Sequence, residues 1–293
     1  MSTPPFLTLP PGVSRVDIET ARGTFAALEA LPGSAAPDRR TALLAPGFTG
    51  SKEDFIAVLA TLTAAGRRVI AVDQRGQYET SGPEDPEAYT LAALGADLVA
   101  LLAALHPAGE PVHVVGHSFG GLVAREAGIA NPSLLASVTL MSSGPAAVGD
   151  PGATRARALV EALQSIELKD IWDGYLGPEA VSAGHAPEIV DFLRTRMLSN
   201  TPAALIGMGR ELTTAPDRVD QLAKVIGDDG PPALVVYGEN DDAWPPSLQA
   251  AMADRLAART VVIPGAAHSP AVEAPEATAS ALAAFWDDAE AAR

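Results

Sequence analysis

Short apolar runs alternate with stretches of helical periodicity along most of this chain. A run that is hydrophobic at nearly every position is typical of a strand buried on both faces, as in parallel sheets whose connecting helices cover both sides. The predicted strands lie within residues 41–47, 67–76, 111–118, 134–145, 231–241 and 259–268, and the predicted helices within 51–66, 90–106, 119–130, 247–258 and 276–292. We therefore predict an α/β fold with a mainly parallel, doubly wound sheet.

Two parts of the chain depart from this alternation. Residues 15–20 and 24–31 are β-rich, are separated by Ala-Arg-Gly, and predict an opening β-hairpin. Residues 146–230 are helical and amphipathic, and they follow the carboxyl end of a strand, where open α/β sheets bind their ligands. This position indicates that the segment forms a lid that covers a binding site. The alternative is a helical addition that only adds bulk. The predicted domains are a core of residues 1–145 and 231–293 and a helical cap of residues 146–230.

Composition excludes several classes of function. The sequence has no cysteine, which removes disulfides, thiolate catalysis and cysteine-bound metals. Its net charge of −16 opposes binding to nucleic acid or to anionic lipid, because both require positive charge on the protein. No apolar run approaches the about 20 residues that cross a membrane, and the first residues lack the basic and apolar parts of a secretory signal. We expect a globular cytoplasmic protein.

A glycine-rich turn between a predicted strand and a predicted helix contains a candidate nucleophile. Gly116, Ser118 and Gly120 fit the pattern G-x-S-x-G. A serine hydroxyl is a weak nucleophile, so a catalytic role also requires a histidine as base and a carboxylate that orients the histidine. The alternative is a serine that only caps the helix or shapes the turn.

A histidine and an aspartate follow later predicted strands. His268 lies in a loop between a strand and the last helix, and Asp241 lies in a turn directly after another strand. Asp242 is a rival for the acid role, and Glu239 is a weaker rival. The predicted catalytic residues are therefore Ser118, Asp241 and His268.

Structural roles are favoured for most of the other histidines. His117 is adjacent to Ser118 in sequence, but the side chain at this position of the turn need not reach the site, which favours packing over proton transfer. His106 and His113 flank a loop and a strand. His185 lies in a loop of the helical insertion, where it faces either the substrate or solvent.

The order Ser118, Asp241, His268, with the serine on a strand–G-x-S-x-G–helix element, resembles the α/β-hydrolase fold superfamily, and within it the cap-bearing serine hydrolases and esterases. The resemblance covers nearly the whole chain, and residues 146–230 correspond to the variable cap of that family. It implies that the backbone N–H of Phe119, at the start of the helix after the nucleophile, is one donor of an oxyanion hole.

Two further loops extend the resemblance. Residues 73–76, followed by Ser81, are similar to the D-x-R-G-x-G-x-S loop of the superfamily, with Tyr78 where the second glycine is expected. The family's second oxyanion donor corresponds to the backbone N–H of Phe48. Many relatives have histidine where this chain has Pro46, which leaves open how the loop around Phe48 is held rigid.

The resemblance implies a serine hydrolase that cleaves a small or medium carboxylic ester or lactone through an acyl-enzyme. It implies a small-molecule acyl substrate and no cofactor. We expect no metal, because the clusters of carboxylates in the sequence lack the spaced histidines of a metal site. The resemblance also admits C–C bond hydrolases, thioesterases, perhydrolases and lyases of menaquinone synthesis, although an arginine is expected in the lyases where this chain has Leu122. Ser118 excludes an aspartate nucleophile, as in haloalkane dehalogenases. The alternative from another class is a non-catalytic, ligand-binding member of the fold.

Apolar and basic side chains are candidates for the substrate pocket. Phe48, Phe119 and Trp244, together with residues of the cap, would provide an apolar lining, and His185 is a further candidate. Three arginines of the cap either bind a substrate carboxylate or, as the pattern favours, lie on solvated helix faces. These are Arg194, Arg196 and Arg210.

Overall fold

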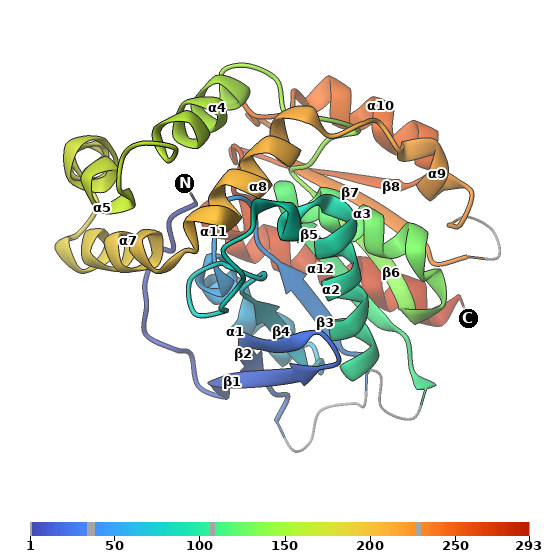
Figure 1. Cartoon of the computed structure of the whole chain (residues 1–293). Helices are drawn as coiled ribbons and strands as arrows, with labels where there is room; N and C mark the ends of the chain where they lie inside the picture. Colours follow the sequence, from blue (N-terminus) through green and yellow to red (C-terminus); the bar gives the residue numbers. More distant parts are fainter. Residues whose placement is uncertain (1, 34–38, 106–108, 227–229, 293) are drawn as a thin grey trace.

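The computed structural model describes residues 2–33, 39–105, 109–226 and 230–292, and it is built around an eight-stranded sheet. The strand order is β1-β2-β4-β3-β5-β6-β7-β8 (Figure 1). The strands are β1 (Val13–Thr20), β2 (Gly23–Ala30), β3 (Ala42–Ala45), β4 (Val69–Val72), β5 (Val112–His117), β6 (Leu135–Met141), β7 (Ala233–Gly238) and β8 (Arg259–Ile263). Every neighbouring pair from β4 to β8 is parallel. The predicted α/β fold with a mainly parallel sheet is confirmed.

Strands β1 and β2 form an antiparallel hairpin at one edge of the sheet. The pairing runs from Val13 opposite Ala30 to Thr20 opposite Gly23. Gly23 has a φ of +126°, a conformation that residues with a side chain rarely adopt, and it closes the turn. The predicted hairpin is confirmed. Because β2 also pairs antiparallel with β4, it runs against the direction of the other described strands.

Helices cover both faces of the sheet. The helices are η1 (Lys52–Phe55), α1 (Ile56–Ala64), η2 (Pro86–Tyr89), α2 (Leu91–Ala104), α3 (Phe119–Ala130), η4 (Pro132–Leu134), α4 (Gly152–Ala162), α5 (Leu168–Ile171), η5 (Trp172–Leu176), α6 (Gly177–Ser182), α7 (Pro187–Ser199), α8 (Pro202–Thr214), α9 (Val219–Ala223), α10 (Pro246–Leu256), α11 (Pro270–Glu273) and α12 (Pro275–Ala291). Residues of α1, α11 and α12 share one apolar cluster, and residues of α2, α3, α9 and α10 share another. Val114 and Val115 of β5 belong to different clusters, because successive side chains of a strand point to opposite faces.

The helices between β6 and β7 lie mostly outside these two layers. Helices α4, α5 and α7 project away from the sheet, and α8 crosses between them and the rest of the molecule (Figure 1). The last helix of the segment, α9, instead contacts α3 and α10. Helices α5 and α6, with the short π-helix η5 between them, lie in the segment predicted to be helical, and Gly174, Gly177 and Pro178 fall within this part of the sequence.

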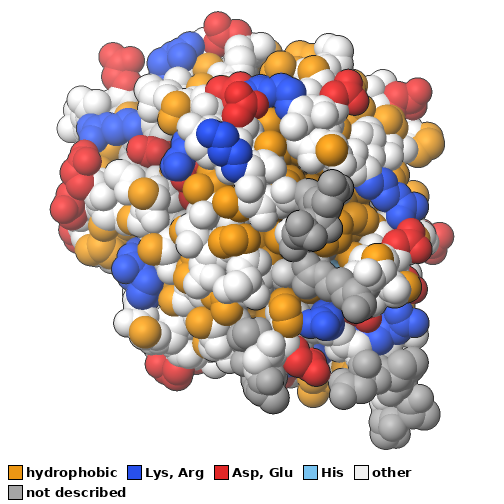
Figure 2. All heavy atoms as spheres, turned by 90° about the vertical axis from the view of Figure 1, so that its right-hand side faces the viewer, with side chains coloured by type: hydrophobic (Ala, Val, Ile, Leu, Met, Phe, Trp, Pro, Cys, Tyr) orange, Lys and Arg blue, Asp and Glu red, His pale blue; other side chains and the backbone are white. Residues whose placement is uncertain are grey.

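The visible surface carries charge of both signs. Acidic and basic side chains are interspersed with hydrophobic ones on the face in Figure 2, so the negative net charge does not form one patch on that face. In the part of the chain that the structure describes, no helix combines the length and hydrophobicity needed to cross a bilayer.

Candidate active site

Ser118 lies at a sharp turn between β5, which ends at His117, and α3, which begins at Phe119. Its φ of 55° and ψ of −121° are unusual for a residue with a side chain. The turn is possible because its neighbours are small: a Cβ on Gly116 would lie 2.1 Å from the carbonyl oxygen of Gly120. The surrounding structure therefore determines a strained backbone conformation that places Ser118, which is 8% exposed, just past the end of the strand.

Ser118 and two side chains from later loops form a chain of hydrogen bonds. His268, in the loop between β8 and α11, has its Nε2 2.9 Å from the Oγ of Ser118. Its Nδ1 lies 3.0 Å from Oδ1 of Asp241, in the loop between β7 and α10. All three residues follow the carboxyl ends of parallel strands, so they meet at one edge of the sheet. The structure thus brings together the three residues that the sequence predicts to act together.

The carboxylate of Asp241 is buried and accepts several hydrogen bonds. Oδ1 accepts the backbone N–H of Ala243 at 3.0 Å, and Oδ2 accepts the side-chain amide of Gln249 at 2.8 Å. Burial by itself would raise the pKa of Asp241, but these bonds and the contact with His268 outweigh it and lower the pKa below its usual value. Asp241 is therefore ionised at neutral pH. Sequence reasoning missed Gln249, because nothing in its helical context distinguishes it from other buried residues of α10.

The two rivals of Asp241 have different surroundings. Asp242 is exposed. The carboxylate of Glu239 accepts the backbone N–H of Gly265 at 3.0 Å. Neither carboxylate is the partner of the imidazole, which is hydrogen-bonded to Asp241.

Two backbone N–H groups lie beside Ser118. Phe119 is the first residue of α3, where N–H groups have no partner within the helix. Gly47 lies directly against Ser118, because a Cβ on it would be 2.9 Å from the Cβ and 3.4 Å from the Oγ of Ser118. The next N–H along the chain is that of Phe48. Within the described residues, neither of these N–H groups donates a hydrogen bond to a protein acceptor.

The loop around Phe48 is held by amide side chains from the loop after β4. Nε2 of Gln74 donates to the carbonyl oxygen of Pro46 at 2.8 Å, and Nε2 of Gln77 donates to that of Gly47 at 2.9 Å. These bonds provide an anchor that does not depend on a histidine at position 46. Sequence reasoning missed both glutamines, since a polar residue in a turn is usually solvated.

Thr80 and Ser81 lie at the end of the same loop. Ser81 is exposed. The preceding residue, Thr80, is buried, and its Oγ1 accepts the backbone N–H of Ala26 at 2.9 Å. Thr80 therefore makes the hydrogen bond that joins the end of this loop to the sheet.

The two remaining pocket candidates lie in different places. Trp244 is only 1% exposed, its ring centroid lies 6.1 Å from that of His268, and its indole N–H donates to the carbonyl oxygen of Ala146 at 3.3 Å. His185 lies half-buried in the loop before α7. None of the contacts among the described residues joins His185 to Ser118.

One arginine of the helical segment contradicts the expectation of a solvated face. Arg196, in the last turn of α7, is fully buried, and its guanidinium lies 2.7 Å from the carboxylate of Asp54 in η1. The expectation was wrong because Arg196 reaches across to Asp54 and to the carbonyl oxygen of Ser2, and does not face solvent. Arg194 and Arg210 are about half exposed, with carboxylates at 3.9 Å and 3.8 Å respectively, as solvated helix faces predict.

Two of the histidines have structural contacts. His113 is buried, stacks on Trp286 and is hydrogen-bonded to Ser137 at 2.7 Å. Nε2 of His117 lies 2.8 Å from the backbone carbonyl oxygen of His268, so Nε2 must carry the proton, because a carbonyl oxygen only accepts. His106 lies outside the described residues. The predicted structural role of His113 agrees with these contacts.

His117 is expected to titrate far below an ordinary histidine. Burial, followed by the positive charge that His268 acquires on protonation, lowers the pKa of His117 to about 4. Because the folded pKa lies below the unfolded value of about 6.5, neutral His117 contributes stability above pH about 6.5 that is lost as the pH falls toward 4. An NMR titration, assigned with His117→Gln, should give a midpoint near 4. A midpoint near 6.5 would contradict this prediction.

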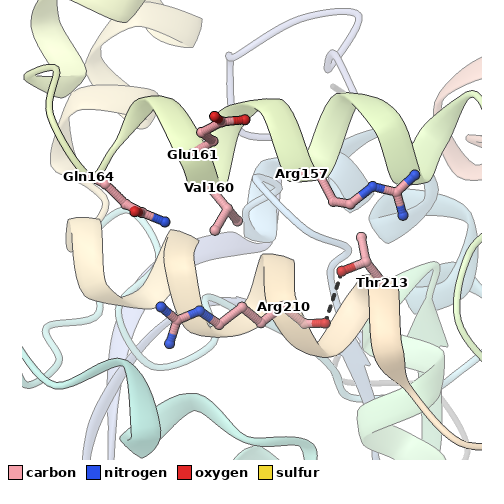
Figure 3. A pocket seen from close by; sticks show the side chains of 6 residues that line it. All are labelled: Arg157, Val160, Glu161, Gln164, Arg210 and Thr213. Carbon is pink, nitrogen blue, oxygen red and sulfur yellow. Dashed lines mark hydrogen bonds between the residues drawn. The ribbon is translucent and has the colours of Figure 1, made fainter.

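A surface groove lies between α4 and α8. It has a volume of about 340 Å³ and is lined by Arg157, Val160, Glu161, Gln164, Arg210 and Thr213 (Figure 3). Val160 extends from α4 toward α8, where a Cβ on Gly209 would lie 2.5 Å from it. The same Cβ on Gly209 would lie 3.4 Å from the ring of Phe48. Val160 and the ring of Phe48 therefore both border the space that a Cβ on Gly209 would enter.

Comparison with known proteins agrees with this arrangement. A model of the alpha/beta hydrolase family matches residues 42–281. The chain is 28% identical over 257 residues to the pimeloyl-(acyl-carrier protein) methyl ester esterase of Edwardsiella ictaluri, covering 85% of this chain and 94% of that protein. It is 33% identical over 160 residues to RutD of Variovorax paradoxus, covering 53% of this chain and 58% of RutD, which is less than two thirds of its length.

A solved structure is also similar to this chain. The thermophilic esterase of Thermogutta terrifontis superposes with a TM-score of 0.71 at 26% identity, covering 94% of this chain and 99% of that one. The family match includes the strands and loops that carry Ser118, Asp241 and His268. The chain therefore belongs to the alpha/beta hydrolase family and is a hydrolase.

Proposed function

We propose that the protein is a serine hydrolase that cleaves a small or medium carboxylic ester or lactone. The observation that carries the proposal is the hydrogen-bonded chain from Ser118 Oγ through His268 to Asp241. A histidine with one nitrogen on the nucleophile and the other on a buried carboxylate is the arrangement that activates a serine. The esterase names of two relatives, one from Edwardsiella ictaluri and one from Thermogutta terrifontis, further support ester cleavage.

The proposed reaction has two halves. Ser118 Oγ attacks the acyl carbonyl while His268 Nε2 takes its proton, and Asp241 stabilises the imidazolium. The N–H groups of Phe48 and Phe119 bind the oxyanion, and His268 then donates its proton to the leaving alcohol oxygen. In the second half, water gives a proton to His268 and its oxygen attacks the acyl-enzyme. The acyl–Oγ bond then breaks, and His268 returns the proton to Ser118 Oγ, which releases the carboxylic acid and restores the starting state. No cofactor takes part in these steps.

Helices α4 to α8 are proposed to act as the cap of the site. The proposal is supported by the position of Gly209 in α8, where a Cβ would lie 3.4 Å from the ring of Phe48. It is also supported by the packing of the partly buried Phe48 against both the core and the cluster formed by α5 to α8. Phe48 is therefore proposed to line the acyl pocket. Trp244, which lies beside His268 but is almost fully buried, is proposed to support the histidine loop.

A series of p-nitrophenyl esters of increasing acyl length tests activity and pocket size together. We expect hydrolysis of the short and medium chains, with kcat/KM falling once the acyl chain exceeds the space beneath the cap. Matched lactone, thioester and C–C bond substrates distinguish the proposed ester hydrolase from a lactonase, a thioesterase or a C–C bond hydrolase. If the protein binds these compounds but hydrolyses none of them, the result would favour a non-catalytic, ligand-binding member of the fold.

A further inference from the structure

The loop that carries the Phe48 N–H is held by a buried side chain from another part of the chain. Gln77, in the loop after β4, is 0% exposed. Its Nε2 donates to the carbonyl oxygen of Gly47 at 2.9 Å, and its Oε1 accepts the backbone N–H of Gln74 at 3.2 Å. These two contacts fix the orientation of the amide, because a carbonyl oxygen only accepts and a backbone N–H only donates.

The Gly47 carbonyl and the Phe48 N–H belong to one peptide unit. A trans peptide unit is planar, so its C=O and N–H point in opposite directions. A bond that fixes the carbonyl oxygen therefore also fixes the direction of the N–H. The same oxygen accepts the N–H of Gly50 at 3.1 Å, which closes a turn around the unit. Gln77 thus ties the carbonyl oxygen of this turn to the loop after β4.

This peptide unit lies against the nucleophile. The Cα of Gly47 is so close to Ser118 that a Cβ there would lie 3.4 Å from its Oγ. A small rotation of the unit would therefore change the distance between the Phe48 N–H and an oxyanion formed at Ser118. Oxyanion stabilisation depends on donors that are already oriented before the reaction.

We propose that Gln77 is a positioning residue that directs the Phe48 N–H toward the oxyanion. The proposal rests on the proposed serine-hydrolase function. Gln77 acts through the peptide unit and need not touch the substrate. Its effect should therefore appear in the chemical step and not in substrate binding.

Two substitutions test this role by removing or keeping the donor. Gln77→Met keeps the length of the side chain but cannot donate, whereas Gln77→His keeps an N–H at similar reach. Because loss of a whole oxyanion donor lowers kcat about 10²–10³-fold, we expect misorientation in Gln77→Met to lower kcat roughly 10–100-fold, with KM changed less than about threefold. Gln77→His should recover most of the lost rate.

Binding of a trifluoromethyl ketone separates positioning from folding. This inhibitor forms an adduct with Ser118 that carries an oxyanion, so its inhibition constant should rise in Gln77→Met by the same factor as kcat/KM falls. A loss of kcat without weaker inhibitor binding would overturn the proposal.

Thr80→Val is the matched control from the same loop. It removes the hydrogen bond to the N–H of Ala26 but leaves the Gly47 carbonyl untouched. When Thr80→Val and Gln77→Met are compared after allowing for their loss of thermal stability, Thr80→Val should retain kcat within about twofold of the wild-type value. A fall in kcat equal to that of Gln77→Met would overturn the proposal, as would full activity of Gln77→Met. If the wild-type protein cleaves no ester, thioester or lactone, it is the proposed function that fails.

Discussion

Ser118→Ala is expected to reduce kcat for p-nitrophenyl ester hydrolysis by about 10⁴-fold or more, with little change in the folded structure. Removal of a nucleophile from a hydrogen-bonded triad leaves only the contribution of binding and oxyanion stabilisation. The substitution removes only one oxygen atom, which His268 contacts at 2.9 Å. Steady-state kinetics and thermal unfolding of the two proteins measure both parts of the prediction.

A fluorophosphonate probe gives an independent result for the same residue. The folded wild-type protein should be labelled at Ser118, identified by peptide mass spectrometry, and Ser118→Ala should not be labelled. Ser133, in the exposed turn η4, supplies the control, because Ser133→Ala should keep full activity and labelling. Absence of labelling in the folded wild-type protein would contradict the serine-hydrolase proposal.

Asp241→Asn is expected to reduce kcat by about 10³–10⁴-fold. An ionised carboxylate accepts a hydrogen bond from Nδ1–H of His268 and leaves Nε2 free to take the proton of Ser118. An asparagine side chain offers its NH₂ group as well, which favours the other tautomer, with the proton on Nε2. Gln249 donates to Oδ2, so it favours the asparagine oxygen at that position and the NH₂ group at the Oδ1 position, toward His268. The Ala243 N–H, which donates to Oδ1, opposes this orientation, so neither orientation of the asparagine satisfies all the groups that now bond to the carboxylate.

The adjacent aspartate is the control for this substitution. Asp242→Asn makes the same chemical change at an exposed position, so its kcat should remain within about twofold of the wild-type value. The acid assignment would be wrong if Asp242→Asn lost orders of magnitude in kcat while Asp241→Asn did not.

The sequence predicted the fold because its signals are local. Apolar strands such as residues 112–117 and the helices that follow them are specified by periodicity within short windows. The turn at Ser118 could also be predicted, since Gly116 and Gly120 are needed at fixed spacing around it. The residues of the proposed triad were found because parallel strands place their carboxyl ends at one edge, whichever helices connect them.

The sequence could not predict the contacts that depend on how distant segments pack. Arg196 and Asp54 are 142 residues apart, and nothing in the pattern of α7 shows that its last turn is buried. The amides of Gln77 and Gln249 resemble ordinary polar residues until the loops around them are in place.

The sequence by itself determined the order of strands and helices and the sharp turn at Ser118. It also determined which residue types, an aspartate and then a histidine, follow that serine at the ends of later strands. Only the tertiary structure decided that Asp241, and not Asp242, meets His268, and that Gln77 holds the peptide unit before Phe48. The physical reason is distance: periodicity and turn chemistry act over a few residues, whereas a hydrogen bond between loops depends on positions within a few tenths of an ångström after the whole core has packed.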